Sequence, residues 1–533
     1  MATMPEPPRR LSQKRRERLM LLGIVAFAAL LRAIFLAWMP NVFSQEGESY
    51  SRINLMLTWL GQGSSYPDTN FGPLHTWFVY AITLPFDNVV WPVRAVHAIC
   101  GVLTVIPLFY MVRALYGTQT AAWSALYLGA FHVHLRASVT GLAEAPFVLC
   151  LFGGLCFAIL ALVQRRVPLR WIVLSALLLN LAGAFRFEAW LFLPPLCLML
   201  LARSAPKAIL FGALNLIFPL IHMGMCYRFA SEPKTVLDAL SFMRTSGTSF
   251  LQYMVHLPLS YRLWAWPQAF WIALTPPVAI LALVGLVWSL ARAVAAIRRR
   301  GRNLLLGVLP VLFLFNIAVF GMRAIKGTID PAIYRYTLSM DLLLIPLAVY
   351  GVREGIAVLR APRAWRGTLL AVVMLCCTGW TLAVALQQTR DNAYPDDVVA
   401  MVQWIHDNGG GQTIITDHDY HPYLMVQSGL PQGSFVNLIW TGELRNELDR
   451  EFYERMWVES RPTLLILDHD CNPDIGGNCV VFDLPRQGSD AIEFEGRRFE
   501  RAFAQGDYSI FRISYPDAGK DFEEDHGEQS ADR

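Results

Sequence analysis

The chain alternates long apolar runs with short polar connections from about residue 20 to residue 388, and then changes to a mixture of polar and apolar positions. Segments of about 18 or more mostly apolar residues can cross a hydrocarbon core of roughly 30 Å. Two shorter apolar stretches, 53–60 and 73–85, are typical of interfacial helices or re-entrant segments. We predict about eleven transmembrane helices, at 20–39, 91–113, 120–138, 143–163, 171–187, 188–203, 208–227, 268–291, 304–321, 336–352 and 368–388.

The basic residues predict the direction of these helices. Six Lys or Arg residues between positions 9 and 18 precede the first apolar run, which is too long for a signal peptide and lacks a small-residue cleavage site. With the N-terminus in the cytoplasm, every strong basic cluster falls in a cytoplasmic loop, as the positive-inside rule requires. These clusters lie at 165–170, 203–207, 292–302 and 353–366. We expect a multi-pass protein of the cell (inner) membrane, with a cytoplasmic N-terminus and an extracytoplasmic C-terminal domain.

The same pattern divides the chain into parts. We predict a basic cytoplasmic N-terminus at 1–19, a transmembrane domain at 20–388 with long outer loops at 40–90 and 228–268, an extracytoplasmic soluble domain at 389–516, and an acidic disordered tail at 517–533. The soluble part reads as α/β, with a helix at 396–407 and strands at 413–416, 463–467, 480–482 and 508–513. The predicted fold class is therefore an α-helical polytopic membrane protein with a C-terminal soluble α/β domain.

The composition and the missing motifs argue against several classes of function. Charged residues make up 16% of the chain and hydrophobic residues 55%, whereas soluble domains usually have about 25% charged residues. No basic face is interleaved with exposed aromatic residues, which argues against a nucleic-acid partner. The chain has no Walker A sequence, dinucleotide fingerprint, zinc-protease HExxH or nucleophile elbow. Energy must then come from an activated substrate or from a gradient.

Carboxylates in the outer loops are candidates for chemistry. Glu46 and Glu48 lie just beyond the first predicted span, where they suit general-base catalysis or a divalent metal; the alternative is a solvated loop with two ordinary Glu residues. Glu144 lies at the outer end of the fourth span. It is either a functional acid at membrane depth or an early helix residue that is favoured by the helix dipole.

Basic residues at the outer face depart from the positive-inside bias. A cationic outer cavity suits a phosphate or pyrophosphate. The alternative is local ion pairing, for example between Arg186 and Glu188 at a break between two spans. The basic residues concerned are Arg94, Arg136, Arg186, Arg228, Lys234, Arg244, Arg262, Arg323, Lys326 and Arg335.

Several other polar residues allow a functional or a structural interpretation. His75 follows a Gly-Pro turn, and His132 and His134 lie near the outer end of the third span; a lone His is more often structural. In the tail, Asp417-His418-Asp419 and Asp468-His469-Asp470 each follow a predicted strand, where a metal site is conceivable but polar loop ends are common. Cys471 and Cys479 flank a turn-rich stretch and form either a disulfide or two free thiols.

The order of these residues resembles the GT-C class of multi-pass membrane glycosyltransferases, of the protein-mannosyltransferase and bacterial lipid-A-sugar-transferase kind. Glu46 and Glu48 are similar to the acidic motif that follows the first span of this class. The segment 71–75, which includes His75, resembles its small-Pro-Leu element. The remaining matches are Arg94-Ala95-Val96, Gly101-Val102-Leu103, Glu144 with Pro146, Arg186-Phe187-Glu188 with Pro194, and Tyr334-Arg335-Tyr336. The class commonly has Asp-Glu or Asp-x-Asp where this chain has Gln45-Glu46-Gly47-Glu48.

This resemblance implies a sugar donor on a polyprenyl phosphate, in contact with membrane lipid, and a glycan, lipid or protein acceptor. It implies that Glu46 or Glu48 is the general base of an inverting transfer and that Arg335, with Arg186, stabilises the leaving phosphate. Substrate contacts are implied for Glu144, His75, Arg94 and Tyr334. A Mg²⁺ or Mn²⁺ ion held by Glu46, Glu48 and Glu144 is a further expectation.

Two other classes of protein were weighed against this interpretation. A transporter or flippase for a lipid-linked saccharide would more often show inverted repeats and paired broken helices at the midplane, and the sequence shows no such symmetry. A membrane-anchored binding protein would need far fewer spans than eleven. The glycosyltransferase interpretation therefore leads.

Overall fold

The structure is a computed structural model of the chain. The chain divides into two compact units, one comprising residues 1–44 and 62–393, and the other residues 45–61 and 394–533. The residues that the structure describes are 8–38, 53, 56, 72–86, 88–164, 166–229, 258–298, 302–326, 337–391, 394–416, 421–430, 434–437, 460–468, 490–494 and 496–515.

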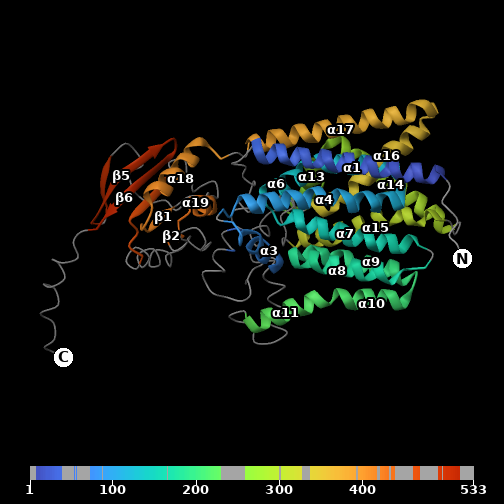
Figure 1. Ribbon diagram of the computed structural model, residues 1–533, viewed down its shortest axis with the longest axis horizontal. Coiled ribbons are helices and arrows are strands. Elements are labelled where there is room, and N and C mark those ends of the chain that lie inside the picture. The colour runs from blue at the N-terminus through green and yellow to red at the C-terminus, as the bar shows by residue number, and fades with distance from the viewer. Residues whose placement is uncertain are drawn as a thin grey trace. The chain divides into compact units, whose positions relative to one another are not determined.

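The larger unit is a bundle of helices that run side by side (Figure 1). In its described part, seven helices are long and apolar enough to cross a membrane, which makes this a multi-pass membrane protein. Every span predicted from the sequence contains helix. The helices are α1 (Pro8–Trp38), α3 (Pro73–Thr83), α4 (Trp91–Tyr116), α5 (Thr118–Ala130), α6 (His132–Thr140), α7 (Glu144–Val163), α8 (Leu169–Phe185), η1 (Phe187–Phe192), α9 (Leu193–Leu201), α10 (Ala205–Asn215), α11 (Ile217–Phe229), α13 (Leu259–Leu274), α14 (Pro276–Arg298), η3 (Arg302–Gly307), α15 (Val308–Ile325), α16 (Leu338–Val358) and α17 (Arg363–Asp391).

Several predicted spans are interrupted in the structure; the span at 208–227, for example, divides at Leu216 into α10 and α11. The span at 120–138 breaks at Phe131, whose backbone is extended. The freed amide of His132 donates to the hydroxyl of Thr381 in α17 at 3.1 Å, so a neighbouring helix repairs this break. The span at 268–291 is the end of α13 and most of α14, separated at Thr275. Pro276 follows Thr275 directly, and because proline lacks an amide hydrogen it cannot continue the hydrogen-bond ladder of α13.

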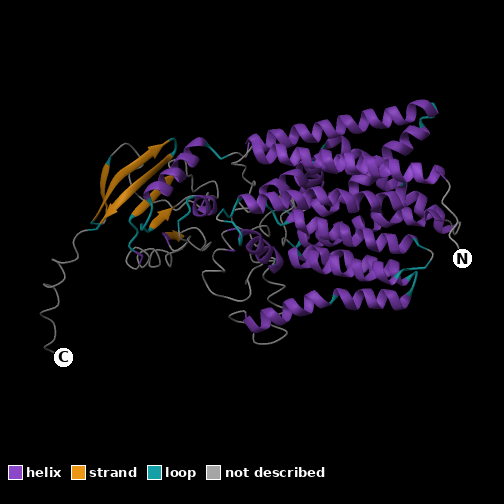
Figure 2. Ribbon diagram, in the orientation of Figure 1, coloured by secondary structure: helices purple, strands orange, loops and turns teal. Residues whose placement is uncertain are grey.

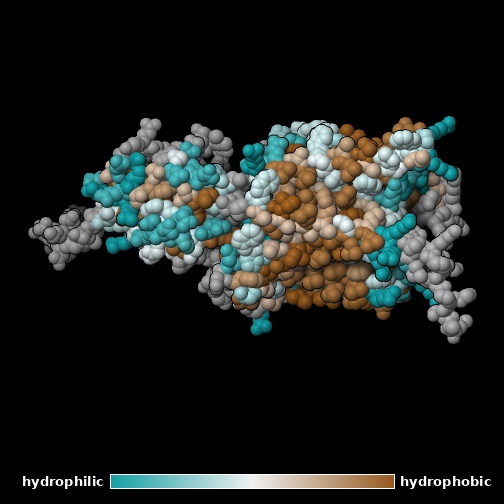
Figure 3. All heavy atoms as spheres, turned by 45° about the horizontal axis from the view of Figure 1, so that its top comes forward, coloured by the Kyte–Doolittle hydropathy of each residue, from teal (hydrophilic) through white to brown (hydrophobic). Residues whose placement is uncertain are grey.

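The outer surface of the bundle is apolar over its middle (Figure 3). Large apolar side chains of its helices, such as Leu177, Ile209 and Leu283, are exposed, as expected of helices that face lipid. The interior is dominated by α7 and α16, most of whose residues are buried. At the crossing of α14 and α16, a Cβ on Gly285 would overlap the Leu347 carbonyl, and a Cβ on Gly351 would lie 2.8 Å from the Leu281 carbonyl. Glycine at both positions lets the two backbones touch, as small residues do in membrane helix pairs.

A buried arginine joins the first helix to its neighbours. Arg32 of α1 is 1% exposed, and its Nε donates to Ser138 Oγ of α6 at 3.0 Å. Its Nη1 donates to the Gly129 carbonyl of α5, and its Nη2 lies 2.9 Å from Nδ1 of His134. Gly101 of α4 provides the space, because a Cβ there would lie 2.8 Å from the Arg32 Nε. His134, a candidate in the sequence, thus contacts Arg32 in the helix packing.

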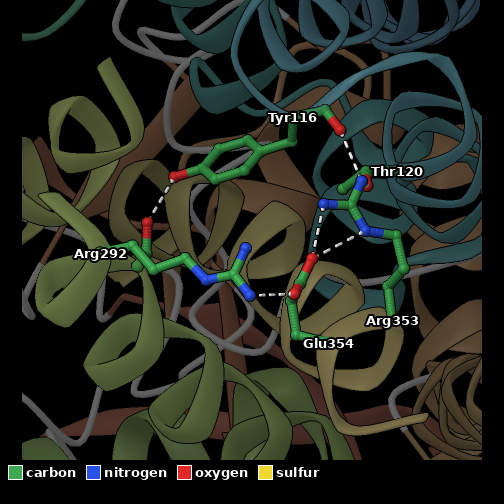
Figure 4. A network of polar contacts seen from close by, with 6 residues as sticks. Tyr116, Thr120, Arg292, Arg353 and Glu354 are labelled. Atoms are coloured by element: carbon green, nitrogen blue, oxygen red, sulfur yellow. Dashed lines mark hydrogen bonds and ion pairs between the residues drawn. The ribbon is translucent and has the colours of Figure 1, made fainter. Parts of the chain in front are cut away.

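A polar network ties α4, α5, α14 and α16 together at the opposite end of α4 from Trp91 (Figure 4). The carboxylate of Glu354 accepts hydrogen bonds from Arg292 Nη2 at 2.6 Å and from Arg353 Nη2 at 2.9 Å. Arg353 also donates to the Tyr116 carbonyl at 2.7 Å. A helix rises about 1.5 Å per residue, so this network and the first turn of α4 are separated by most of the length of a 26-residue helix.

The smaller unit contains a mixed sheet, and in Figure 2 its strands contrast with the helical bundle. The strand order is β2-β1-β3-β6-β5-β4, with β1 parallel to β2 and β3 and the other pairs antiparallel. Helix α18 packs against β5 and β6, with Trp404 and Phe503 in ring contact. The elements are α18 (Asp396–Asn408), β1 (Ile414–Thr416), α19 (His421–Gln427), β2 (Phe435–Asn437), β3 (Leu464–Asp468), β4 (Ala491–Phe494), β5 (Arg497–Gln505) and β6 (Tyr508–Ser514).

This sheet confirms the predicted α/β character of the tail. The helix at 396–407 and the strands at 413–416, 463–467 and 508–513 correspond to α18, β1, β3 and β6. The hairpin of β4 and β5 and the short elements α19 and β2 were not predicted. The predicted strand at 480–482, residues 417–419, 469 and 470, and the pair Cys471 and Cys479 lie outside the described residues.

Candidate functional site

The turn between α6 and α7 brings Glu144 to the end of the bundle where α4 begins. Gly141 ends α6 in a left-handed conformation, φ +84°, that glycine adopts without strain. A Cβ on Gly141 would lie 3.1 Å from Val93 of α4. Arg94 of α4 secures the same turn, because its Nε donates to the Val139 carbonyl at 2.8 Å. Glu144 is then the first residue of α7, and its side chain is buried.

The break between α8 and η1 brings a guanidinium to Glu144. Arg186 has an extended backbone, φ −151° and ψ 130°, between two helical segments. Gly183 allows the chain to fold back tightly, since a Cβ there would lie 2.5 Å from the indole Nε1 of Trp190. The break that the sequence predicted near Arg186 is confirmed, and it directs the Arg186 side chain toward α7.

Arg186 binds two carboxylates, and we call Glu144, Arg186 and Glu188 the acidic clamp. Its Nη1 donates to Oε1 of Glu144, and its Nη2 donates to Oε1 of Glu188 at 2.6 Å. The side-chain exposures are 2% for Glu144, 11% for Arg186 and 21% for Glu188. Glu188 also has an electrostatic contact with Arg323 of α15. Two acids from separate elements are thus held at fixed positions by one planar guanidinium.

A short helix of the first outer loop docks beside the acidic clamp. Gly72 precedes α3, and a Cβ at this position would overlap the carbonyls of Ala184 and Phe185, the last two residues of α8. His75 of α3 places its Nε2 3.0 Å from Nε2 of His97 of α4. The Nδ1 of His97 lies 2.7 Å from the Val93 carbonyl, which can only accept. His97 therefore carries its proton on Nδ1, and His75 is the donor between the two rings when both are neutral.

We expect substitution of Gly72 by Val to loosen α3. The added side chain must displace the carbonyls that end α8, and overpacking of this kind costs about 1–3 kcal/mol. The free energy of unfolding in an SDS titration measures the loss. Gly321→Ala is the matched control, because nothing lies within 4 Å of a Cβ on Gly321. If both variants were as stable as the wild type, the proposed close contact between α3 and α8 would be wrong.

The structure thus brings together four of the predicted site residues at one end of the bundle. Glu144 and Arg186 contact each other directly. Arg94 and His75 reach the same region through α4 and α3. Glu46, Glu48, Tyr334 and Arg335 lie outside the described residues, and their roles remain predictions.

Two further histidines, His97 and His132, are buried in the bundle. His97 was missed in the sequence, although its spacing from Arg94 places both on one face of α4. His132 was considered as a functional candidate. In the structure its Nε2 lies 2.6 Å from the Ala273 carbonyl, at the break after α13. This contact gives His132 a part in holding that break.

Of the three predicted metal ligands, Glu144 lies among the described residues. Among them, no group of three or more His, Cys, Asp and Glu side chains is arranged to hold a metal ion. Glu144, one of the three proposed ligands, is bound by Arg186. The described residues therefore supply no ligand set for Mg²⁺ or Mn²⁺.

Comparison with known proteins now identifies the fold. A family model described as dolichyl-phosphate-mannose-protein mannosyltransferase matches residues 70–223, a segment that includes His75, Arg94, Glu144 and Arg186. The structure of ArnT from Cupriavidus metallidurans bound to undecaprenyl phosphate is similar over 92% of this chain and 97% of that chain, with a TM-score of 0.58 and 12% sequence identity. This chain has the fold of the GT-C glycosyltransferases.

A second GT-C structure supports the same identification. The oligosaccharyltransferase of Archaeoglobus fulgidus, solved with a tethered acceptor peptide, matches 84% of this chain and 69% of that chain, with a TM-score of 0.52 and 12% identity. No curated protein sequence matches this chain. The resemblance to the GT-C class seen in the sequence is therefore confirmed at the level of fold.

Proposed function

We propose that this GT-C protein is a glycosyltransferase that moves a sugar from a polyprenyl-phosphate donor to an acceptor on the outer face of the membrane. The observation that carries the proposal is the acidic clamp, in which Arg186 fixes Glu144 and Glu188 at one end of a GT-C bundle. The ArnT neighbour was solved with undecaprenyl phosphate, and an amphipathic donor of this type would enter such a bundle from the lipid.

The proposed reaction is a single displacement. Glu46 or Glu48 takes the proton of an acceptor hydroxyl as its oxygen attacks the anomeric carbon of the sugar. The bond from this carbon to the phosphate oxygen breaks on the opposite face, and the bonding electrons leave with the polyprenyl phosphate. Attack from the opposite face inverts the anomeric centre. The phosphate is already a good leaving group, which agrees with the lack of nucleotide-binding motifs in the sequence.

The other site residues stabilise the leaving phosphate or position the substrates in this proposal. Arg335 stabilises most of the negative charge that develops on the leaving phosphate. Arg186 already contacts two carboxylates, so less of its charge is available to a phosphate; it holds Glu144 and Glu188, which orient the acceptor. Arg94 fixes the turn before Glu144. His75 and Tyr334 contribute contacts to the sugar or head group.

The orientation and the location complete the proposal. The basic loops place the end of the bundle that begins α4 on the non-cytoplasmic side. The tail then lies outside, and the membrane is the inner membrane of a bacterium. The acceptor is a glycan, lipid or protein exposed there.

Mass analysis of surface glycans tests this function in cells. A strain that lacks the chain should lose one sugar from a surface glycan, lipid or protein and should accumulate the polyprenyl-phosphate sugar. The wild-type gene should restore the product, and a variant with both Glu46→Gln and Glu48→Gln should not. If the double variant restored the product fully, a transporter or flippase would explain the phenotype better than a transferase.

A further inference from the structure

A buried carboxylate lies in the bundle at the break between α13 and α14, and it takes no part in the proposed reaction. Asp341 of α16 is 0% exposed. Its Oδ2 accepts a hydrogen bond from the Thr337 hydroxyl at 2.7 Å, and its Oδ1 has no hydrogen-bond partner. Within the described part of the chain, no Lys, Arg or His side chain pairs with it. A buried carboxylate without compensation costs several kcal/mol, so it is neutralised either by a proton or by a cation that binds beside it.

The helix break lies level with this carboxylate. Gly285 of α14 packs against Gly351 of α16, and further along both helices Arg292 of α14 binds Glu354 of α16, so the two helices run parallel. Thr275 precedes Gly285 by ten residues, and Asp341 precedes Gly351 by ten residues. Counted back from the glycine contact, the two residues therefore lie at the same level. Tyr127 of α5 joins the two positions, because it lies beside Thr275 and has an electrostatic contact with Asp341.

Thr275 has two features that are typical of ion-binding sites in membrane proteins. Its backbone has φ +67°, a conformation that costs a non-glycine residue about 1–3 kcal/mol and that concentrates at functional sites. Its Oγ1 is buried and lies within reach of the Tyr127 hydroxyl, but the two do not form a hydrogen bond of normal geometry. The Tyr127 hydroxyl donates its proton to the Leu274 carbonyl at 2.8 Å instead. Interrupted membrane helices whose unwound ends face a buried acid commonly coordinate small cations.

We propose that Asp341 and Thr275 hold a monovalent cation of the size of sodium at the break between α13 and α14. Oδ1 of Asp341 supplies the charge, and Oγ1 of Thr275 supplies a neutral oxygen. One carboxylate balances one positive charge, and among the described residues no second acid has an electrostatic contact with Asp341, which favours a monovalent over a divalent ion. The cation fixes the break of α13 and α14 against the start of α16. This site is separate from the acidic clamp, and its existence does not depend on the proposed transferase activity.

The purified full-length chain in detergent tests the site with sodium itself as the probe. Sodium chloride is titrated against choline chloride at constant ionic strength, and the midpoint of thermal unfolding is measured together with the binding of radioactive sodium. We expect a midpoint that rises to saturation and about one bound ion per chain, because an ion that binds only the folded state stabilises it. A midpoint that is the same in sodium, potassium and choline, with no bound ion, would overturn the proposal and leave a proton as the neutralising charge.

Variants separate this site from general salt effects. Asp341→Asn should lose both sodium binding and the sodium-dependent rise of the midpoint. Thr275→Val keeps the shape of the side chain and removes its oxygen, so the apparent sodium affinity should fall about tenfold. Glu354→Gln is the matched control, because Glu354 lies on the same helix but is paired with Arg292 and Arg353; it should keep the sodium response. If Asp341→Asn does not fold, unchanged sodium affinity in Thr275→Val overturns the proposal.

Discussion

Substitution of Arg186 by Met should destabilise the protein by about 3–5 kcal/mol, the cost of leaving a buried charge without its partner. Glu144 is 2% exposed and its Oε1 is bound by Arg186, so removal of the guanidinium leaves a carboxylate inside the bundle. The free energy of unfolding in an SDS titration measures this loss. Transfer activity should fall as well, since both acids of the clamp lose their fixed positions.

Two further variants decide whether charge is the cause. Arg186→Met combined with Glu144→Gln should recover part of the stability, because the charge on Glu144 that Arg186 balances is then removed as well. Arg292→Met is the control, since Arg292 is 43% exposed and Glu354 keeps Arg353 as a second partner, so the loss of stability should be smaller. A loss in Arg186→Met no larger than that in Arg292→Met would show that the acidic clamp contributes little.

Substitution of the general base should have the largest effect on the reaction. Proton transfer by a positioned base contributes roughly 10²–10⁴-fold to a rate, so either Glu46→Gln or Glu48→Gln should reduce transfer by that factor. The other variant should change the rate far less. Sugar transfer by each purified variant, at equal folded concentration, measures the difference.

The stability of the two variants shows whether a loss of activity comes from the reaction or from misfolding. Both residues lie in a loop that the sequence places at the membrane surface, so stability should change by less than about 0.5 kcal/mol. A large loss of stability in both variants, with activity falling only in proportion, would contradict the assignment of a base to this pair.

The transmembrane bundle could be predicted well because its signal is strong and local. Apolar runs and basic loops indicate helices and their direction one segment at a time. The break at Arg186 was also visible, since Arg186 and Glu188 interrupt an apolar run. The break at Thr275 was missed although Pro276 and Pro277 follow it, because the apolar run continues through both residues.

The contacts of the site could not be predicted in the same way. Arg186 and Glu144 are 42 residues apart, and nothing in either segment indicates the other as its partner. The two histidines that meet at 3.0 Å come from α3 and α4, and their pairing depends on how Gly72 docks on α8. In the tail, β5 was missed because Arg497, Arg498, Glu500 and Arg501 interrupt its first half, so it lacks the continuous apolar run of β3.

The transfer reaction itself tests the central claim most directly. The purified chain is placed in lipid nanodiscs with polyprenyl-phosphate sugars that carry a radioactive label, and with an extract from the deletion strain as acceptor. The account predicts that label moves to one product while an equal amount of polyprenyl phosphate appears, and that the variant with Glu46→Gln and Glu48→Gln forms neither. Undiminished transfer by that variant, or a folded wild-type chain that transfers no label from any such donor, would contradict it.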